Sequence, residues 1–299
     1  MSINRPKILL IGCDGQVGWE LQRSLAVLAD VTATSLCGRY GYTLDLLDPD
    51  AVKKVVLETG PDYIVNAAAH TAVDKAESEI ELSEKLNSDA PELLATLAAE
   101  NHAVLIHYST DFVFDGESDR PYREEDSTAP LGVYGKTKLE GERRVLATEA
   151  AAMVFRTSWV YGNHGQNFMK TMLRLFRDRD ELKVVDDQRG APTWSRMIAE
   201  ATAQVIGQLQ SGSLDAAELK GIYHLTNSGD TSWYGFAQQI LELSGESCSL
   251  MPICTHEYPT PARRPAYSVL DNGKLNQVFK LNLPDWYSSL KLCMEDEGA

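Results

Sequence analysis

The chain has 299 residues, which is enough for one large α/β unit with a smaller appendage. Hydrophobic residues make up 43% and charged residues 24% of it, and the absence of any low-complexity tract argues against disorder. The formal net charge of -15 at pH 7 would repel a phosphate backbone, which disfavours nucleic-acid binding but not the binding of a small anionic ligand.

The cysteines and the N-terminal residues indicate the cellular compartment in which the protein works. The five cysteines include no C-x-x-C pair and none at zinc-finger spacing from a histidine, so we predict no metal site and expect reduced thiols. The first six residues lack the pattern of a signal peptide. No stretch approaches the roughly 18 apolar residues of a membrane span. We therefore expect a cytoplasmic protein.

Strand and helix patterns alternate through the first half of the chain. Predicted strands cover residues 7–12, 31–36, 63–69 and 103–109, and predicted helices cover residues 16–28, 51–58, 90–100 and 134–146. This rhythm predicts a Rossmann-type α/β fold, which is a doubly wound parallel sheet with helices on both faces. Ligands of such sheets bind at the carboxyl ends of the strands.

The rhythm loosens after residue 161. Residues 167–177, 194–208 and 233–244 have helical patterns, residues 222–226 look extended, and the proline-rich segment 258–265 predicts a loop over the cleft. We predict an NAD(P)-binding domain over residues 1–161, with return segments from further along the chain. Residues 162–299 would form a smaller mixed lobe that binds substrate and is interleaved with the first.

Three glycines, Gly12, Gly15 and Gly18, lie between the first strand and the first helix. A turn with positive φ, a close backbone approach to a pyrophosphate and tight packing of helix on strand each favour glycine. The pattern predicts a dinucleotide-binding turn, although a purely structural turn would carry the same residues.

The second strand bears on the choice of cofactor. An acidic residue about 20 positions beyond the glycines would bind the ribose 2′-hydroxyl of NAD, but the strand ends at Ser35 and Arg39 follows shortly after. These two residues are candidates for a 2′-phosphate, and Asp45 could meet the adenine edge. Arg39 could equally be a solvated loop residue.

Tyr134 and Lys138 lie four residues apart on a predicted helix and so share one face. A lysine ammonium close to a phenol favours the phenolate and would lower the pKa of Tyr134 from about 10 toward working pH. Tyr134 would then donate a proton to an alkoxide formed by hydride transfer. Thr110 and Asp111, at a strand end, could bind a substrate. A surface pair and a simple turn are the alternatives.

Five segments in one order carry a specific resemblance. They are VNAAAHTAVDKAE at 65–77, STDFVFDG at 109–116, VYGKTKLEGE at 133–142, RTSWVY at 156–161 and DQRGAPT at 187–193. Together they resemble the dTDP-4-dehydrorhamnose reductases of the extended short-chain dehydrogenase/reductase superfamily, and the match covers nearly the whole chain.

The resemblance implies reduction of the C4 ketone of dTDP-4-dehydro-β-L-rhamnose by NADPH or NADH, with catalytic residues Tyr134, Lys138 and Thr110. It implies cofactor contacts at Tyr134, Lys138, Gly15, Gln16, Val17, Ser35, Asp45, Leu46, Ala67, Ala68, Ala69, His70 and Thr71, to which the local patterns above add Gly12, Gly18 and Arg39. The implied substrate contacts are Thr110, Asp111, Trp159, Asn167, Arg189, Pro192 and Arg264, with Arg263 a further candidate for the diphosphate.

The chain departs from the family pattern at two places. Phe112 stands where members commonly carry tyrosine, which removes one hydroxyl contact. Some members are dimers bridged by Mg²⁺ through glutamates; Glu20 matches one such position, but Arg196 stands near another, so we do not predict that metal. A monomer and a homodimer both remain open.

Two alternatives accompany this interpretation. One is a non-catalytic, NADP-binding regulatory subunit that resembles the β subunit of methionine adenosyltransferase. The other is a reductase of a different nucleotide 4-ketosugar, since hydride transfer and proton donation would be the same.

Overall fold

The computed structural model describes residues 5–297, so the outermost ends of the two predicted domains lie outside the described residues. The central element is a parallel seven-stranded sheet in the order β11-β6-β5-β4-β1-β2-β3. Its strands are β1 (Lys7–Ile11), β2 (Asp30–Ser35), β3 (Tyr42–Thr43), β4 (Tyr63–Asn66), β5 (Val104–Thr110), β6 (Ala151–Thr157) and β11 (Gly221–His224). The predicted doubly wound parallel sheet is confirmed.

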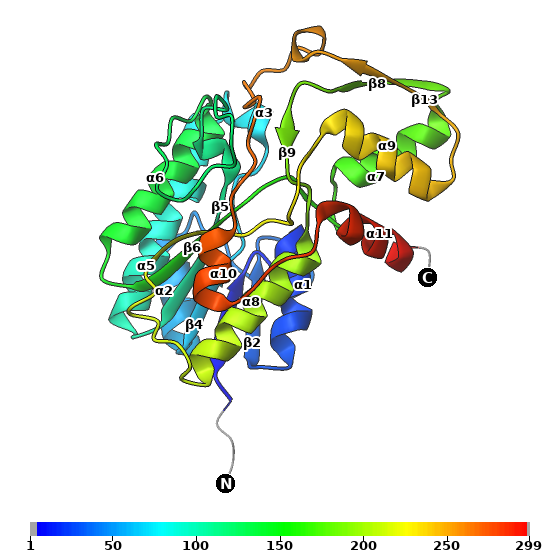
Figure 1. Ribbon diagram of the computed structural model, residues 1–299. Helices are drawn as coiled ribbons and strands as arrows, with labels where there is room; N and C mark the ends of the chain where they lie inside the picture. The colour runs from blue at the N-terminus through cyan, green and yellow to red at the C-terminus, as the bar shows by residue number, and fades with distance from the viewer. Residues whose placement is uncertain (1–4, 298–299) are drawn as a thin grey trace.

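Helices cover both faces of this sheet (Figure 1). One face carries α1 (Gln16–Ala26), α8 (Ser195–Gln210) and α10 (Gly273–Phe279), and the other carries α2 (Pro49–Thr59), α5 (Ala90–Glu100) and α6 (Val133–Ala147). Successive strand residues point to opposite faces, so Leu9 packs with α2 and α5 whereas Leu10 packs with α1 and α8. The two apolar cores explain why the strands read as nearly continuous hydrophobic runs.

Three short helical segments connect β4 to α5, and a fourth follows β5. They are α3 (Val73–Ala76), α4 (Ile80–Glu84), the π-helical turn η1 (Lys85–Asp89) and the 3-10 turn η2 (Asp111–Val113). The predicted strand over residues 63–69 extends three residues too far, because the Asn66 side chain accepts a hydrogen bond from the Ala68 N–H and turns the chain out of the sheet.

The second lobe packs around its own apolar cluster, which includes Tyr161, Phe236 and Trp194. Its elements are β7 (Val160–Tyr161), α7 (Phe168–Asp178), β8 (Glu181–Val185), β9 (Arg189–Gly190), β10 (Thr193–Trp194), β12 (Thr231–Ser232), α9 (Trp233–Ser244), β13 (Ser249–Ile253), η3 (Thr255–Glu257) and α11 (Trp286–Glu297). Among the described residues these strands form three two-stranded sheets: β7 with β10 and β8 with β13 are parallel, and β9 with β12 is antiparallel.

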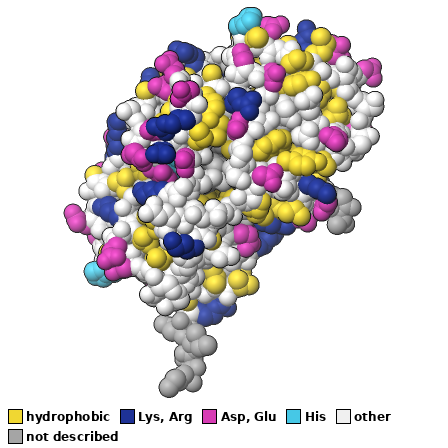
Figure 2. All heavy atoms as spheres, in the orientation of Figure 1, with side chains coloured by type: hydrophobic (Ala, Val, Ile, Leu, Met, Phe, Trp, Pro, Cys, Tyr) yellow, Lys and Arg dark blue, Asp and Glu magenta, His cyan; other side chains and the backbone are white. Residues whose placement is uncertain are grey.

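The chain passes between the two lobes several times. After β10, α8 returns to pack on α1, β11 joins the main sheet beside β6, and α10 follows much later. Acidic and basic side chains are interspersed on the face seen in Figure 2. Within the described residues, no helix is both long and apolar enough to cross a membrane.

Candidate functional site

The turn between β1 and α1 leaves the start of α1 open. Gly12 has φ +83°, and a side chain there would lie 2.7 Å from the Ala68 backbone nitrogen, so only glycine fits. The N–H groups of Gly12 and Cys13 both donate to the Thr34 carbonyl, at 2.8 and 3.0 Å. Gly15 is exposed and caps α1 without a side-chain hydrogen bond. The first N–H groups of the helix are therefore available to an anion.

Gly18 and the two residues before it complete this turn. A Cβ on Gly18 would lie 2.0 Å from the Gly12 carbonyl oxygen, so the glycine permits close contact of helix and strand. Gln16 and Val17, at the start of α1, are half-buried. Gln16 also reaches the second lobe, where its side-chain oxygen accepts a 2.9 Å hydrogen bond from Asn167.

The predicted adenosine contacts lie at the ends of β2 and β3. Ser35 is buried and its hydroxyl accepts a hydrogen bond from the Gly38 N–H, while Arg39 is exposed. Asp45 is half-buried and accepts from the Leu47 N–H, and Leu46 is buried in the core shared with α2. These residues lie at the same edge of the sheet as the glycine turn, because β1 and β2 are parallel neighbours and their carboxyl ends lie side by side.

Residues Ala67, Ala68 and Ala69 follow β4 and are half-buried, and Thr71 is exposed. The His70 ring turns away from this segment: its Nε2 lies 2.9 Å from Glu79 Oε2 and its Nδ1 lies 3.1 Å from the Ser83 hydroxyl. The backbone of His70 is also engaged, because its N–H donates to Asn87 Oδ1 at 2.9 Å and its carbonyl accepts from Asn87 Nδ2 at 3.2 Å. The ring and the backbone of His70 are thus both held by neighbouring side chains.

The three predicted catalytic side chains come from β5 and α6. Thr110 ends β5, where its hydroxyl donates to Asp111 Oδ1 at 3.1 Å and also hydrogen-bonds Tyr134. Tyr134 begins the first turn of α6, and Lys138 follows one turn later with its Nζ donating to the Tyr108 carbonyl at 2.6 Å. The Phe112 ring packs edge-on against Tyr134, with ring centroids 5.7 Å apart.

The expected lowering of the Tyr134 pKa is wrong for this structure. Burial raises the pKa of Tyr134 to about 12, the hydrogen bond with Thr110 opposes this, and the charge of Asp111 adds to it. Burial also lowers the pKa of Lys138 to about 8, against the attraction of Glu142. Desolvation therefore dominates both groups, and Tyr134 stands as a protonated phenol at neutral pH.

Asp111 is the most perturbed carboxyl group at the site. Burial raises its pKa to about 7, while hydrogen bonds from Ser268 and Thr110 lower it. Its Oδ2 is buried and has no hydrogen-bond partner among the described residues. Ser268 comes from the far end of the chain, and no local pattern in the sequence pointed to it.

Trp159 follows β6 with a positive φ of 45°, a backbone conformation that is strained for a tryptophan. Its ring stacks on Trp233, with centroids 3.5 Å apart and planes 5° from parallel. A Cβ on Gly190 would lie 2.5 Å from the same ring. Trp233 and Gly190 thus fix Trp159, and the sequence had identified only Trp159.

The other predicted substrate contacts are distributed over the second lobe. Asn167 caps α7 and Pro192 is buried between β9 and β10. Arg189 is exposed and pairs with Asp230, and Arg264 pairs with Asp74 Oδ2 at 2.8 Å. Arg263 is exposed. Both Arg189 and Arg264 thus already hold a carboxylate in this structure.

Comparison with known proteins is decisive about the family. Residues 6–298 match the family model described as the RmlD substrate binding domain. A relative from Escherichia coli (strain K12) named dTDP-4-dehydrorhamnose reductase is 46% identical over 300 residues, covering 97% of each chain. The chain belongs to the dTDP-4-dehydrorhamnose reductase family.

Solved structures of the family support the same assignment. A dTDP-4-dehydrorhamnose reductase from Clostridium acetobutylicum superposes with a TM-score of 0.88 at 39% identity, covering 98% of this chain and all of that one. One from Bacillus anthracis str. Ames, solved in complex with NADP, also gives a TM-score of 0.88, at 32% identity, covering 98% of this chain and 99% of that chain.

Glu20 and Arg196, the two positions considered for a Mg²⁺ bridge in the sequence analysis, form an ion pair. Arg196 Nε lies 3.3 Å from Glu20 Oε2, and the same guanidinium pairs with Asp296 on α11. A guanidinium and a hard cation would compete for these oxygens. Among the described residues, no group of three or more His, Cys, Asp or Glu side chains is arranged to hold a metal.

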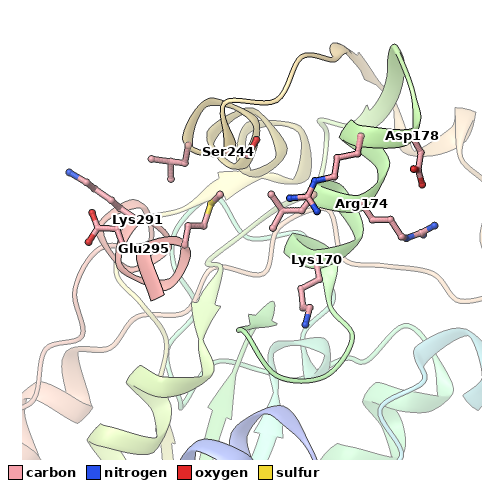
Figure 3. Close-up of a pocket in the computed structure, with 10 residues that line it drawn as sticks. Lys170, Arg174, Asp178, Ser244, Lys291 and Glu295 are labelled. Atoms are coloured by element: carbon pink, nitrogen blue, oxygen red, sulfur yellow. The ribbon is translucent and has the colours of Figure 1, made fainter. Parts of the chain in front are cut away.

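A cavity of about 930 Å³ lies apart from these residues, between α7, α9 and α11. Figure 3 shows Lys170, Arg174 and Asp178 along α7, and Lys291 and Glu295 on α11. None of the predicted catalytic residues lines it, so this cavity is separate from the predicted site.

Proposed function

We propose that this protein uses NADPH or NADH to reduce the C4 ketone of dTDP-4-dehydro-β-L-rhamnose, giving dTDP-β-L-rhamnose. The observation that carries the proposal is the hydrogen bond between Thr110 and Tyr134 at the carboxyl end of β5, with Lys138 one turn further along α6, on the same sheet edge as the open N-terminus of α1. The names of the related reductases, and the NADP bound to the Bacillus anthracis protein, support this substrate and cofactor.

Tyr134 is the proposed proton donor. When bound, a reduced nicotinamide would supply the hydride for the C4 carbon, and the C4 oxygen would then need a proton. The phenol is protonated at neutral pH because its pKa is raised to about 12, so its proton can pass to that oxygen, and the resulting phenolate regains a proton from solvent. Thr110 would hold the carbonyl oxygen through its hydroxyl.

Lys138 is the proposed contact to the nicotinamide ribose. Its Nζ donates to the Tyr108 carbonyl at 2.6 Å and lies 3.4 Å from His107 Nε2, which leaves one N–H for a ligand. The open turn at Gly12, Gly15 and Gly18, with Gln16 and Val17, would bind the pyrophosphate. Ser35, Arg39, Asp45 and Leu46 would border the adenosine, and residues 67–71 the nicotinamide.

The sugar nucleotide would lie against the second lobe. Asp111 and Trp159 would contact the sugar, and Asn167, Arg189, Pro192 and Arg264 would shape the nucleotide pocket. For Arg264 to bind the diphosphate it would have to exchange the Asp74 carboxylate for phosphate oxygens, which present similar bidentate geometry.

We assign the lobes as predicted, with residues 1–161 and the return segments forming the cofactor domain and residues 162–299 the substrate lobe. We place the protein in the cytoplasm, as a monomer or homodimer. Light scattering of the purified protein distinguishes the two oligomeric states.

The reaction is tested by following NAD(P)H absorbance with enzymatically generated dTDP-4-dehydrorhamnose and each cofactor in turn. We expect substrate-dependent oxidation and dTDP-rhamnose as product. Tight NADPH binding without oxidation would instead favour the regulatory-subunit alternative, and oxidation with only another 4-ketosugar would change the substrate.

Tyr134→Phe isolates the proton donor. We expect kcat to fall about 10²- to 10⁴-fold while NADPH binding stays within a few-fold of the parent, because only the hydroxyl is lost. Tyr287→Phe, which removes a hydroxyl from the exposed face of α11, is the matched control. An unchanged kcat in Tyr134→Phe would exclude the assigned role.

A further inference from the structure

Three buried polar side chains, Asn66, His107 and Lys138, are linked in a row that ends at the predicted catalytic lysine. Asn66 ends β4, His107 lies opposite it in the parallel register of β5, and Lys138 reaches down from α6. Their exposed fractions are 1%, 0% and 2%. Asn66 Nδ2 lies 3.1 Å from His107 Nδ1, and His107 Nε2 lies 3.4 Å from Lys138 Nζ.

The Asn66 amide has a defined orientation. Its Oδ1 accepts a 3.1 Å hydrogen bond from the Ala68 backbone N–H, and a flipped amide would place two donors against each other. Nδ2 therefore faces His107 and must donate to Nδ1. A neutral imidazole that accepts at Nδ1 carries its hydrogen at Nε2.

His107 is neutral in this environment. Burial is the main cause that lowers its pKa well below the usual value, and this cause does not depend on the charge of Lys138. A Lys138 ammonium would lower the pKa of His107 further, and a weaker contact with the Asn66 backbone carbonyl raises it. That carbonyl is the competing acceptor, and it would favour a hydrogen on Nδ1. The side-chain amide of Asn66 at 3.1 Å outweighs it, because an N–H at both atoms would leave two buried donors in conflict.

The tautomer of His107 determines what Lys138 meets. If Nε2 of His107 carries a hydrogen that points at Nζ of Lys138, an ammonium there cannot accept it, because its nitrogen has no lone pair. A neutral amine has a lone pair and can accept this hydrogen bond. The amine keeps an N–H for the Tyr108 carbonyl at 2.6 Å and one for the ligand side. The Asn66 amide, the His107 ring, the Lys138 nitrogen and the Tyr108 carbonyl therefore all have matching hydrogen-bond partners only when Lys138 is uncharged.

We propose that Asn66 and His107 are positioning residues that favour the neutral amine of Lys138 and so set the pH range in which Lys138 exchanges between amine and ammonium. The part of this inference that concerns turnover rests on the proposed function; the part that concerns the His107 tautomer does not.

Other ionisable groups near Lys138 come from each element around it. On α6, Glu142 favours the ammonium, but it is held by Arg156 of β6 at 2.6 and 2.9 Å. From η2, Asp111 faces Tyr134. On the other side of α6, Asp89 of η1 and Glu92 of α5 pair with Arg144, toward the far end of the helix.

The tautomer is measured directly in the parent protein by ¹⁵N NMR of histidine-labelled material. The chain has six histidines, and His224 serves as an internal reference because its Nδ1 lies 3.2 Å from the Asp271 carbonyl and must carry a hydrogen there. We expect the opposite pattern for His107, with Nε2 protonated at pH 7. A hydrogen on Nδ1, or an imidazolium, would overturn the proposal.

His107→Gln tests the effect on Lys138. A glutamine amide reaches the position of Nε2 and can turn its oxygen toward Nζ, so it accepts from an ammonium. We expect the titration of Lys138, read from its ¹³Cε shift, to move up by about one pH unit, the equivalent of one hydrogen bond to a charged group. The alkaline limb of the kcat/KM profile should move with it.

Asn66→Ala provides a second route, because it frees His107 to change tautomer and should shift the same titration in the same direction. His224→Gln also removes a buried imidazole and controls for lost stability; we expect it to leave the Lys138 titration in place. Folded His107→Gln and Asn66→Ala with an unshifted Lys138 would refute the proposal. Since the ¹³Cε shift needs no turnover, an inactive parent protein would refute the reductase function while leaving this inference to be decided on its own.

Discussion

The buried ion pair between Glu142 and Arg156 should be the most costly single contact to break in the lobe that contains the seven-stranded sheet. Arg156 donates to Glu142 through Nε at 2.9 Å and Nη2 at 2.6 Å, and their side chains are only 1% and 2% exposed. The pair ties α6, the helix of Tyr134 and Lys138, to β6. Glu142→Gln leaves an uncompensated guanidinium in the interior.

Removing one partner of such a pair typically costs about 3 to 5 kcal/mol of unfolding free energy. At about 2 to 4 °C for each kcal/mol, the midpoint of thermal unfolding should fall by on the order of 10 °C. Differential scanning calorimetry or a urea titration measures this. The Arg156 Nη1 has no partner among the described side chains even in the intact pair, so the loss should lie in the upper part of that range.

Glu140→Gln is the matched control, because Glu140 lies on the same helix and pairs with Arg144 but is 44% exposed. It should cost about 1 kcal/mol or less. Combining Glu142→Leu with Arg156→Met should recover most of the loss, since apolar side chains of similar size need no counter-charge. The reasoning fails if Glu142→Gln is no more costly than Glu140→Gln, or if the apolar pair is as unstable as the single variant.

Two further outcomes are expected at the site. Gly190→Ala places a methyl group 2.5 Å from the Trp159 ring, so the ring must leave its stack on Trp233. We expect KM for the sugar nucleotide to rise at least several-fold with a smaller change in kcat. An unchanged KM would contradict the assigned role of Trp159. The pKa of Asp111 in the folded protein is raised to about 7, so folding favours its protonated form and the free energy of unfolding should fall as pH rises from about 4 to about 7. Asp111→Asn should flatten this pH dependence in unfolding titrations. If the variant shows the same pH dependence as the parent protein, Asp111 is not its cause.

The sequence allowed much of the sheet and the glycine turn to be predicted, because both depend on local patterns. Apolar runs that alternate with helices specify a parallel sheet, and the spacing of Tyr134 and Lys138 places them on one face of α6. The family resemblance, confirmed by the comparisons, depended on five motifs that together span most of the chain.

Contacts between distant segments were not predictable in the same way. Ser268 reaches Asp111 and Trp233 stacks on Trp159 only after the second lobe has folded, and neither pairing leaves a periodic signal. The direction of the Tyr134 pKa shift was predicted wrongly because a nearby lysine can be read from spacing, whereas the depth of burial cannot. The hydrogen-bond direction through Asn66 likewise requires the position of the Ala68 N–H.

The repeated passage of the chain between the lobes limits how this protein can be divided. A fragment ending at residue 161 would lack β11, leaving β6 as an open edge, and would lack α8, exposing the apolar face of α1 and of the strands beneath it. The segment up to residue 161 is therefore not a unit that recombination could move intact into another chain. Under the proposed function, substrate specificity in such an architecture would change by point substitutions rather than by exchange of whole lobes.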